Sequence, residues 1–370
     1  MGKEAIAPEV RVGESSSSSN GFSPHIYVRP LRISVIICAY SLDRWDALVA
    51  AVQSSFGQTL RPAEVVVVID HNDDLLGRAT VEFPDGLVIP NRGTKGLSGA
   101  RNTGVAATTG DVIAFLDDDS FAEPDWLEQL AGPLTDSRIA GVGGWIVPKW
   151  VDGPARWLPE SYYWVIGCSY AGLPSSQARV RNPIGANMAL RRDIFTSVGG
   201  FTSGIGRIGK VPLGCEETEL CIRYTAYFPD RRFIMVREAV VHHLVPASRL
   251  TWHYFWTRCW AEGLSKAAVS SLDGSQAGLS AEWRYLLGSL PREFLHCLRV
   301  LPRHPRTATA RAALIVVGTW CAFAGLIRGR VALHRHPIAA AGDMGDIVEL
   351  PRPSVEESPQ APRHPKVLAG

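Results

Sequence analysis

Uninterrupted apolar runs alternate with helical patterns early in the chain, and this alternation most limits the folds that the chain can adopt. The segments "ISVIICAY" (33–40) and "AEVVVVID" (63–70) are rich in β-branched residues, as is typical of strands buried on both faces. Between them, "DALVAAVQSSF" (46–56) has helical spacing and is followed by Gly57 and Pro62. This order predicts a β-α-β unit with parallel strands.

The same alternation continues as far as an acidic run. A strand at "GLVIP" (86–90), a glycine-rich turn (91–99) and a helix over "ARNTGVAATT" (100–109) precede the buried strand "VIAFL" (112–116). We therefore expect a doubly wound, mainly parallel α/β sheet covered by helices. Ligands of such sheets bind at the carboxyl ends of the strands. Three polar clusters follow such ends and should converge on one crevice: "AYSLDR", "DHNDD" and "DDDS".

The last of these strands runs into three adjacent carboxylates, Asp117, Asp118 and Asp119. Like charges at the tip of a buried strand are poorly screened, so they destabilise the fold unless a cation or a hydrogen-bond network offsets them. An acidic turn that caps a helix at 126–130 is the alternative interpretation. Capping needs only one such residue, however, so the run favours a hard divalent cation with oxygen ligands.

Composition excludes some classes of protein and bounds the ordered region. The chain has 370 residues, 46% of them apolar, which is enough for one large domain or two smaller ones. A net charge of +2, with no basic stretch interleaved with aromatics, argues against a nucleic-acid partner. Seven scattered cysteines without a C-x-x-C pair indicate a reduced, cytosolic compartment. Disordered tails are expected at 1–30 and 341–370, and no signal-peptide pattern precedes the first strand.

Taken in order, these motifs resemble a known family. "SVIICAY", "VVVVIDHND", "NRGTKGLSGARNTGVAATTGD" and "FLDDD" resemble the Rossmann-like, nucleotide-binding half of family 2 glycosyltransferases, the large GT-A-type group of inverting nucleotide-sugar transferases. "NPIGANMALRRDIFTSVGGF", "LGCEETELCIRY" and "VVHHLVP" resemble its acceptor-side half. The resemblance implies a GT-A-type domain over residues 31–275, followed by a C-terminal amphipathic or hydrophobic helical region at 276–340.

The resemblance also implies a metal site. Asp117 and Asp119 match the family's Asp-x-Asp pair, which holds a divalent cation, Mn²⁺ or Mg²⁺, against the diphosphate of the donor. Asp119 is the implied direct metal ligand, Asp117 faces both the ribose and the metal, and Asp118 is the middle position of the nucleotide-sugar site.

Further residues of the nucleotide site follow from the same comparison. Asp70, after the second strand, is implied to contact the base or ribose, with Ala39 and Arg44 beside it, and Arg101 would line the pocket. For Arg44 and Arg101 the alternative is a solvated charge on a helix face. We expect the donor to be a UDP-sugar.

An acidic pair, Glu216 and Glu217, opens the segment "EETELCIRY". Both could simply be the negative first turn of a helix. Inverting transfer needs one base within reach of the acceptor hydroxyl, and the glycine-rich run at 199–214 just upstream is typical of a loop that closes over substrate. Family members usually have Glu-Asp here with the second carboxylate as base, so the resemblance implies Glu217, and Glu216 stays open as the alternative.

Two histidines and an aromatic helix complete the site candidates. The family pattern puts a late histidine at the metal or diphosphate; we favour His242 as a metal ligand, with His243 as the alternative. The long helix predicted over 249–272 carries an aromatic stripe, and the first interpretation of this stripe is a helix face packed in the core. A wall for a sugar or lipid acceptor is the second interpretation, with the Trp- and Tyr-rich stretch at 149–167 as its opposite side.

Beyond residue 280 the chain becomes apolar and basic. The run "AALIVVGTWCAFAGLI" (312–327) has sixteen uncharged residues between Arg311 and Arg328. Residues 292–335 contain eight arginines and one glutamate. A helix packed on the domain, a helix lying in the membrane interface and a short span all remain open. The arginine excess favours peripheral or single-span association with an anionic cytoplasmic membrane surface. A glycan or a polyprenyl- or other lipid-linked acceptor would fit this location.

Two rival functions deserve comparison. A Mg-dependent phosphatase of the haloacid-dehalogenase type also has Asp-x-Asp after a strand. The motif of that class requires Thr or Val at the position where this chain has Phe121. A nonenzymatic nucleotide-binding membrane scaffold would have no use for the acidic pair at 216–217. Release of a nucleoside diphosphate from a nucleotide sugar is expected of the transferase alone.

Overall fold

The computed structural model describes most of the chain between the two expected tails, which lie outside the described residues, as does most of the glycine-rich run. The described residues, which begin at Leu31, form one compact unit. The described residues are 31–203, 214–273 and 280–335.

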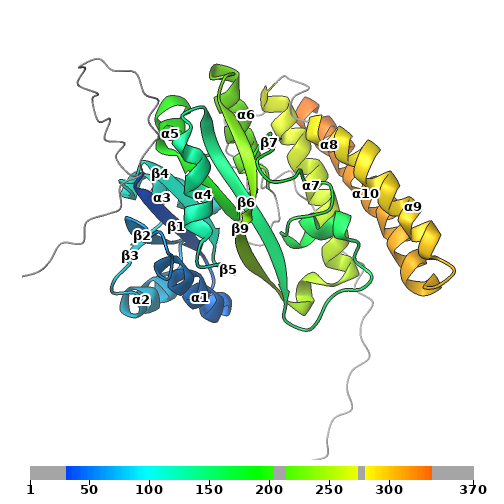
Figure 1. Cartoon of the computed structure of the whole chain (residues 1–370), viewed down its shortest axis with the longest axis horizontal. Coiled ribbons are helices and arrows are strands. Elements are labelled where there is room, and N and C mark those ends of the chain that lie inside the picture. The colour runs from blue at the N-terminus through cyan, green and yellow to red at the C-terminus, as the bar shows by residue number, and fades with distance from the viewer. Residues whose placement is uncertain (1–30, 204–213, 274–279, 336–370) are drawn as a thin grey trace, which may run out of the picture. The chain divides into compact units, whose positions relative to one another are not determined.

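The first half of this unit is the predicted alternation of parallel strands and helices (Figure 1). Strand β1 pairs in parallel with both β2 and β4, and β2 pairs in parallel with β3. The sequence analysis did not predict α2, whose helical pattern is weak because only two of its side chains are buried. The elements are β1 (Ile33–Ala39), α1 (Trp45–Phe56), β2 (Glu64–Ile69), α2 (Asp73–Glu82), β3 (Leu87–Pro90), α3 (Leu97–Ala107) and β4 (Val112–Asp117).

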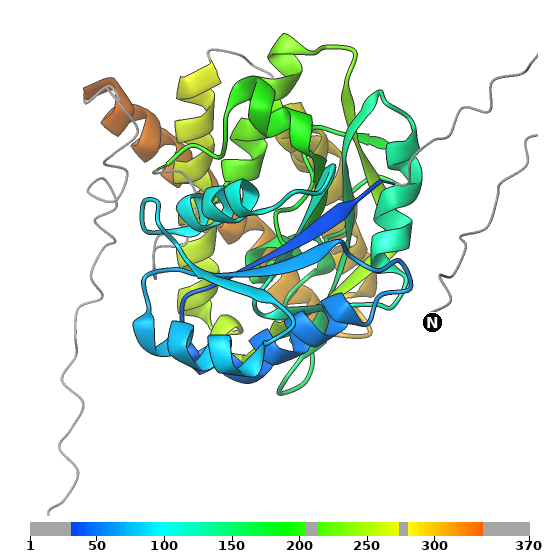
Figure 2. The same cartoon turned by 90° about the vertical axis from the view of Figure 1, so that its left-hand side faces the viewer.

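Helices cover both faces of these strands, because alternate residues of each strand point to opposite sides. Val35 and Val67 join a core with α1 and α2, whereas Ile36 and Val66 join a second core with α3. Figure 2 shows the two layers, with α1 and α2 (blue to cyan) on one side of the strands. The continuous β-branched runs are thus buried on both faces, as the sequence predicts.

The second half extends the sheet with strands of mixed direction. The order is β3-β2-β1-β4-β8-β6-β9-β5, with β7 paired to β9. Strand β8 is antiparallel to β4 and β6, while β6 and β9 are parallel. The expected fold class is confirmed, but beyond β4 the sheet contains both antiparallel and parallel pairs. The new elements are β5 (Ser120–Ala122), α4 (Trp126–Ala131), β6 (Ile139–Trp150), β7 (Arg179–Val180), β8 (Asn187–Arg191), α5 (Arg192–Val198), α6 (Glu216–Tyr227) and β9 (Arg232–Val245).

The C-terminal helices pack on the domain instead of standing apart from it. Helix α10 runs alongside α7 and α9 (Figure 1). Glycines allow the close approach to α7: a Cβ added at Gly325 would lie 2.3 Å from the carbonyl oxygen of Trp260. These helices share a third core with the turn at Glu160–Ile166. The helices are α7 (Trp252–Asp273), α8 (Ser280–Arg284), α9 (Leu290–Val300) and α10 (Pro305–Arg335), with a π-helical turn at Tyr285–Ser289.

Candidate functional site

A cavity of about 730 Å³ lies where the carboxyl end of β4 meets the second half of the fold. Its lining includes Asp117 and Asp119 from the acidic run, Arg101 from α3 and Glu217 from α6. Of the three polar clusters expected to converge, only "DDDS" contributes residues to the lining of this cavity. "AYSLDR" reaches the acidic run through Arg44, and "DHNDD" does not line the cavity.

The first two aspartates lie in different environments. The side chain of Asp117 is 34% exposed, and its Oδ1 lies 3.5 Å from Nη2 of Arg101. Asp118 is buried; its Oδ1 accepts a 2.7 Å hydrogen bond from Nη1 of Arg44, and its Oδ2 has no hydrogen-bond partner among the described residues. Burial raises the pKa of Asp118 to about 7, and Arg44 only partly opposes this shift. Asp117 is thus the carboxylate most open to a ligand.

Asp119 is the most strongly paired of the three. Its Oδ2 lies 2.6 Å from Nη2 of Arg249 and 3.2 Å from Nη1 of Arg44, and its Oδ1 lies 3.2 Å from Nε2 of His243. Burial favours the neutral acid, but His243 and Arg249 outweigh it and hold the pKa of Asp119 well below its usual range. The acidic run is therefore offset within the protein chiefly by arginines.

The two histidines of β9 point to opposite sides, because adjacent residues of a strand alternate. Nε2 of His242 lies 2.6 Å from Oε1 of Glu123, and its ring stacks on Phe121 with centroids 5.0 Å apart. His243 is the residue that lines the cavity, beside Asp119. Our preference for His242 is therefore corrected by one position: the structure places His243 at the acidic run.

Arg101 and Arg44 both join the acidic cluster. Arg101 is 2% exposed; it donates to Oε1 of Glu216 over 2.7 Å and to the carbonyl of Gly185 over 2.9 Å. Arg44 donates to Asp118. The alternative of a solvated helix-face charge is therefore wrong for Arg101, and Arg44 is ion-paired. Contact of either residue with a nucleotide stays a prediction.

The acidic pair at the start of α6 is divided between two roles. Cys215, which precedes the helix, has φ of +74°, a left-handed conformation that is uncommon for residues other than glycine. Both glutamates line the cavity, but Glu216 is buried in an ion pair with Arg101. Burial raises the pKa of Glu217 to about 8, and the charge of Glu216 adds to the shift. A simple acidic helix turn does not account for this arrangement.

Asp70 holds the glycine-rich turn against the end of β2. Its Oδ1 accepts a 2.7 Å hydrogen bond from Nδ2 of Asn91, and its Oδ2 accepts a 2.9 Å bond from the backbone N–H of Gly96. Its own N–H donates to the carbonyl of Ala39 over 2.8 Å. Asp70 and Ala39 are thus neighbours, as expected. Their contact with a base or ribose stays a prediction.

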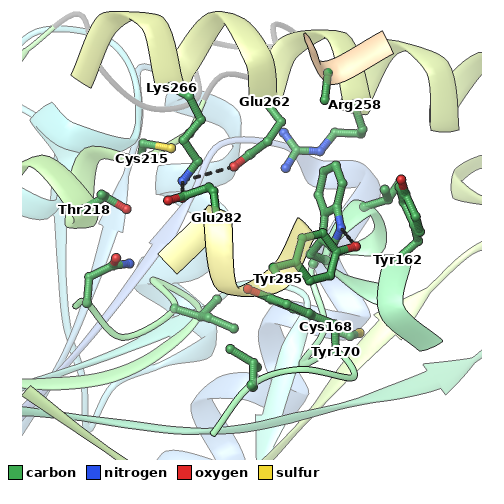
Figure 3. A pocket seen from close by; sticks show the side chains of 18 of the residues that line it. Tyr162, Cys168, Tyr170, Cys215, Thr218, Arg258, Glu262, Lys266, Glu282 and Tyr285 are labelled. Atoms are coloured by element: carbon green, nitrogen blue, oxygen red, sulfur yellow. Dashed lines mark hydrogen bonds and ion pairs between the residues drawn. The ribbon is translucent and has the colours of Figure 1, made fainter. Parts of the chain in front are cut away.

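A second polar cluster lines the cavity on the side of the C-terminal helices, and no pattern in the sequence predicted it. Nζ of Lys266 lies 2.7 Å from Glu282 and 3.3 Å from Glu262 (Figure 3). Arg181 donates to both oxygens of Glu282, over 2.8 and 3.0 Å. These contacts tie α8 to α7 and to the strand β7 region, at the edge of the cavity.

The aromatic stripe of α7 is partly core and partly paired surface. Phe255 is buried in the third core, which supports the core interpretation. Trp252 is 58% exposed and stacks on Trp157 with centroids 6.0 Å apart, so the two Trp-rich segments do face each other. Stacking of an acceptor sugar on these rings stays a prediction.

Comparison with known proteins identifies the family. Residues 34–199 match the family model "Glycosyl transferase family 2". A glucosyl-dolichyl phosphate glucuronosyltransferase of Haloferax volcanii is 34% identical over 246 residues, which is 65% of this chain and 78% of the relative. The chain belongs to glycosyl transferase family 2. It is a glycosyltransferase, and the phosphatase and scaffold alternatives are set aside.

Two further comparisons support the family and the fold. The succinoglycan biosynthesis protein ExoM of Rhizobium meliloti is 26% identical to this glycosyltransferase over 317 residues, 82% of this chain and 94% of the relative. A solved mannosyltransferase from Pyrobaculum calidifontis, in complex with GDP-mannose and Mn²⁺, matches with a TM-score of 0.53 and 18% identity. The match covers 84% of this chain and 88% of that one, and it shows a shared GT-A fold.

The acidic run of this glycosyltransferase fits a divalent cation that is shared with a substrate. Among residues 31–203, 214–273 and 280–335, no three His, Cys, Asp or Glu side chains are grouped so as to hold a metal. Mg²⁺ commonly binds through one or two carboxylates plus substrate phosphates, so a closed protein cage is not required. Asp117 is partly exposed to the cavity, and Asp119 lines it as well, paired there with Arg249, Arg44 and His243. These hard oxygen donors fit such a cation.

We predict that Glu216 mainly stabilises the fold. Glu216→Gln would leave the Arg101 guanidinium buried without its nearest anion, which lowers the free energy of unfolding by about 3 kcal/mol. Chemical denaturation measures this loss. Arg138→Gln is the control, because Arg138 and its partner Asp136 form an ion pair with Arg138 largely exposed, and no measurable change is expected. Equal stability of wild type and Glu216→Gln would contradict the structural role of the pair.

Proposed function

We propose that this glycosyltransferase moves a sugar from a nucleoside-diphosphate sugar, with UDP as the expected nucleotide, to a hydroxyl group of a lipid-linked or glycan acceptor, inverting the anomeric carbon. One observation carries the proposal: a single cavity joins the acidic run to Glu217. Arg101 connects the two ends, since it contacts both Asp117 and Glu216, the neighbour of Glu217. A donor held at the aspartates and an acceptor at Glu217 would therefore share one cavity.

The donor side supplies charge complementarity for a diphosphate. Asp117 and Asp119 would hold a divalent cation, which, when bound, stabilises the negative charge of the departing nucleoside diphosphate. Arg249 lines the cavity next to Asp119 and adds a fixed positive charge there. His243, in contact with both Asp119 and Arg249, helps to orient them.

The acceptor side supplies a base. Glu217 would accept the proton of the acceptor hydroxyl while that oxygen attacks the anomeric carbon and the bond to the diphosphate breaks. A base is most effective when its pKa lies near the working pH, and burial raises the pKa of Glu217 to about 8. Glu216 is ion-paired with Arg101 and lies beside Glu217, where its charge adds to the raised pKa of that base.

A lipid-linked acceptor at the cytoplasmic face of a membrane is the class that we favour. The Haloferax volcanii relative is named for a glucosyl-dolichyl phosphate substrate. Pro305–His334 is, among the described residues, a helix long and apolar enough to cross a membrane by length and composition. Both observations support membrane association, and the arginine excess supports an anionic surface.

Release of nucleoside diphosphate tests the proposal. Purified full-length protein is incubated with UDP-, GDP- and dTDP-sugars, with and without Mn²⁺, in the presence and absence of polyprenyl-phosphate-linked sugars. We expect release that needs the cation and rises on addition of an acceptor. No release above the protein-free control with any donor would overturn the proposed function.

The pH dependence of transfer follows from the environment of Glu217. Because the base works only when deprotonated and its pKa is about 8, kcat/KM should rise about tenfold per pH unit below that value and level off above it. Initial rates across a pH series measure this profile. A profile that stays flat from acid pH through neutrality to alkaline pH would contradict a base with a raised pKa.

A further inference from the structure

Large aromatic side chains stand exposed at the edge of the cavity. Trp283 is 58% exposed, Trp320 is 67% exposed and Phe323 is 51% exposed, and all three also line the cavity. The rings of Trp320 and Phe323 lie edge to face with centroids 6.2 Å apart. Side chains that line the cavity and are also exposed to solvent lie at its opening, so the mouth of the cavity is aromatic and apolar. Clustered apolar exposure of this kind indicates an interaction surface.

The mouth is continuous with an apolar face of α10. Val316, Trp320, Phe323, Ile327 and Val331 are all more than 40% exposed. Their spacing of three and four residues puts them on one side of the helix, and we refer to these five residues as the outer stripe.

The opposite side of α10 is fixed to the domain, which decides how the helix can meet a membrane. Gly325 and Gly329 lie against Trp260 and Ala267 of α7 so closely that an added Cβ would clash. Lipid therefore cannot surround this helix. Its uncharged run of sixteen residues is also about 24 Å long, less than the roughly 30 Å of a bilayer core. Of the three arrangements that the sequence left open, one that lies in the interface fits best.

Charge identifies an anionic membrane as the surface that the outer stripe meets. Residues 290–334 contain seven arginines, one glutamate and no lysine or aspartate. Exposed arginines lie near both ends of the stripe: Arg303 and Arg306 precede it, and Arg328 and Arg330 lie between its last two residues. Arginines beside an apolar helix face are drawn to anionic lipid head groups.

Inside the mouth, α7 presents polar side chains to the cavity at four-residue spacing: Tyr254, Arg258, Glu262 and Lys266. Figure 3 shows Arg258 and Lys266 on the same helix, on either side of Glu262. The charge of Lys266 also acts on Glu217. Two basic groups thus lie in the cavity with the aromatic mouth and with the proposed base, and one of them, Lys266, is ion-paired with Glu262 and Glu282.

We propose that the outer stripe docks into the interface of an anionic membrane, and that an acceptor with a phosphate on a polyprenyl chain enters the cavity sideways from the lipid, past Trp320 and Phe323. Arg258 and Lys266 receive its phosphate, and the chain stays at the aromatic mouth. The inference rests on the proposed function and specifies its acceptor: an amphiphile in which chain and phosphate are both recognised.

Three probes separate these contributions: farnesyl phosphate, farnesol and inorganic phosphate, titrated calorimetrically into the full-length protein. Farnesyl phosphate should bind at least about tenfold more tightly than either of the others. Trp320→Ser with Phe323→Ser should weaken it at least about fivefold, and Arg258→Gln should bring its affinity down toward that of farnesol. Unchanged nucleotide-sugar affinity in these variants shows that they fold.

The matched control uses the same helix face away from the cavity. Val316→Ser with Ile327→Ser should keep farnesyl phosphate affinity within about twofold of wild type, while binding to phosphatidylglycerol-containing vesicles falls about tenfold. Equal loss of farnesyl phosphate affinity in both pairs of variants would overturn the proposal that the acceptor enters the cavity past Trp320 and Phe323. Wild-type protein that forms dimers but does not bind vesicles would overturn the proposal that the outer stripe docks into a membrane. Failure to turn over any nucleotide sugar, with farnesyl phosphate still bound, would count against the proposed function alone.

Discussion

Asp119→Asn should abolish cation-dependent binding of the nucleotide sugar, with a loss of at least about 100-fold in affinity. The carboxylate is the charge on which Arg249, Arg44 and His243 converge, and the proposed cation needs it as a ligand. An amide keeps the shape but removes the charge, so the cations around it repel both one another and Mn²⁺. Calorimetric titration of UDP with and without Mn²⁺ measures the effect.

Asp111→Asn is the control for this variant. Asp111 lies just before β4, at the opposite end of the strand from the acidic run, and accepts a hydrogen bond from the backbone N–H of Arg32. The same amide change there should leave the affinity for UDP and Mn²⁺ as in the wild type. Affinity for UDP that depends on Mn²⁺ equally in Asp119→Asn and in the wild type would refute the metal role of Asp119.

Glu217→Gln should lower transfer by about 10²- to 10⁴-fold while binding of UDP and the cation remains near normal. Glutamine keeps the size of the side chain and most of its hydrogen bonding but cannot accept a proton. The measurement is the initial rate of nucleoside diphosphate release that depends on added acceptor. The pH profile of any residual transfer should also lose its rise toward pH 8.

Glu216→Gln distinguishes catalysis by the base from stabilisation of the helix. Because Glu216 is paired with Arg101, its loss should appear mainly in the free energy of unfolding, whereas loss of Glu217 should appear mainly in the rate. Inactive Glu216→Gln together with active Glu217→Gln would move the base by one residue. Full activity in both variants would mean that the pair has no part in the chemistry.

The sequence predicted the features that depend on local pattern. Strands β1, β2 and β4 are buried on both faces, so their apolar runs are continuous and easily recognised. The place of Arg101 beside Asp117 was implied by the family resemblance and not by the strand pattern. The direction of β8 did not follow, because it depends on how the long connection from β6 returns to the sheet.

Residues brought in by distant segments could not be predicted. The choice between His242 and His243 depends on the register of β9 against β5, which pairs Ser120 with His243. Arg249 carries no local signal, since it reaches Asp119 across 130 positions of sequence. The pairing of Lys266 with Glu282 likewise depends on how α8 folds back onto α7. Such contacts arise from tertiary packing, which a single sequence does not encode in its periodicity.

The anomeric configuration of the product tests the central claim most directly. A donor whose sugar is α-linked to its diphosphate is incubated with the enzyme and an acceptor, and the configuration of the new glycosidic bond is determined by proton NMR. Direct displacement assisted by Glu217 predicts a β-linked product. An α-linked product would contradict the account, because retention requires either a covalent intermediate or attack from the side of the leaving diphosphate.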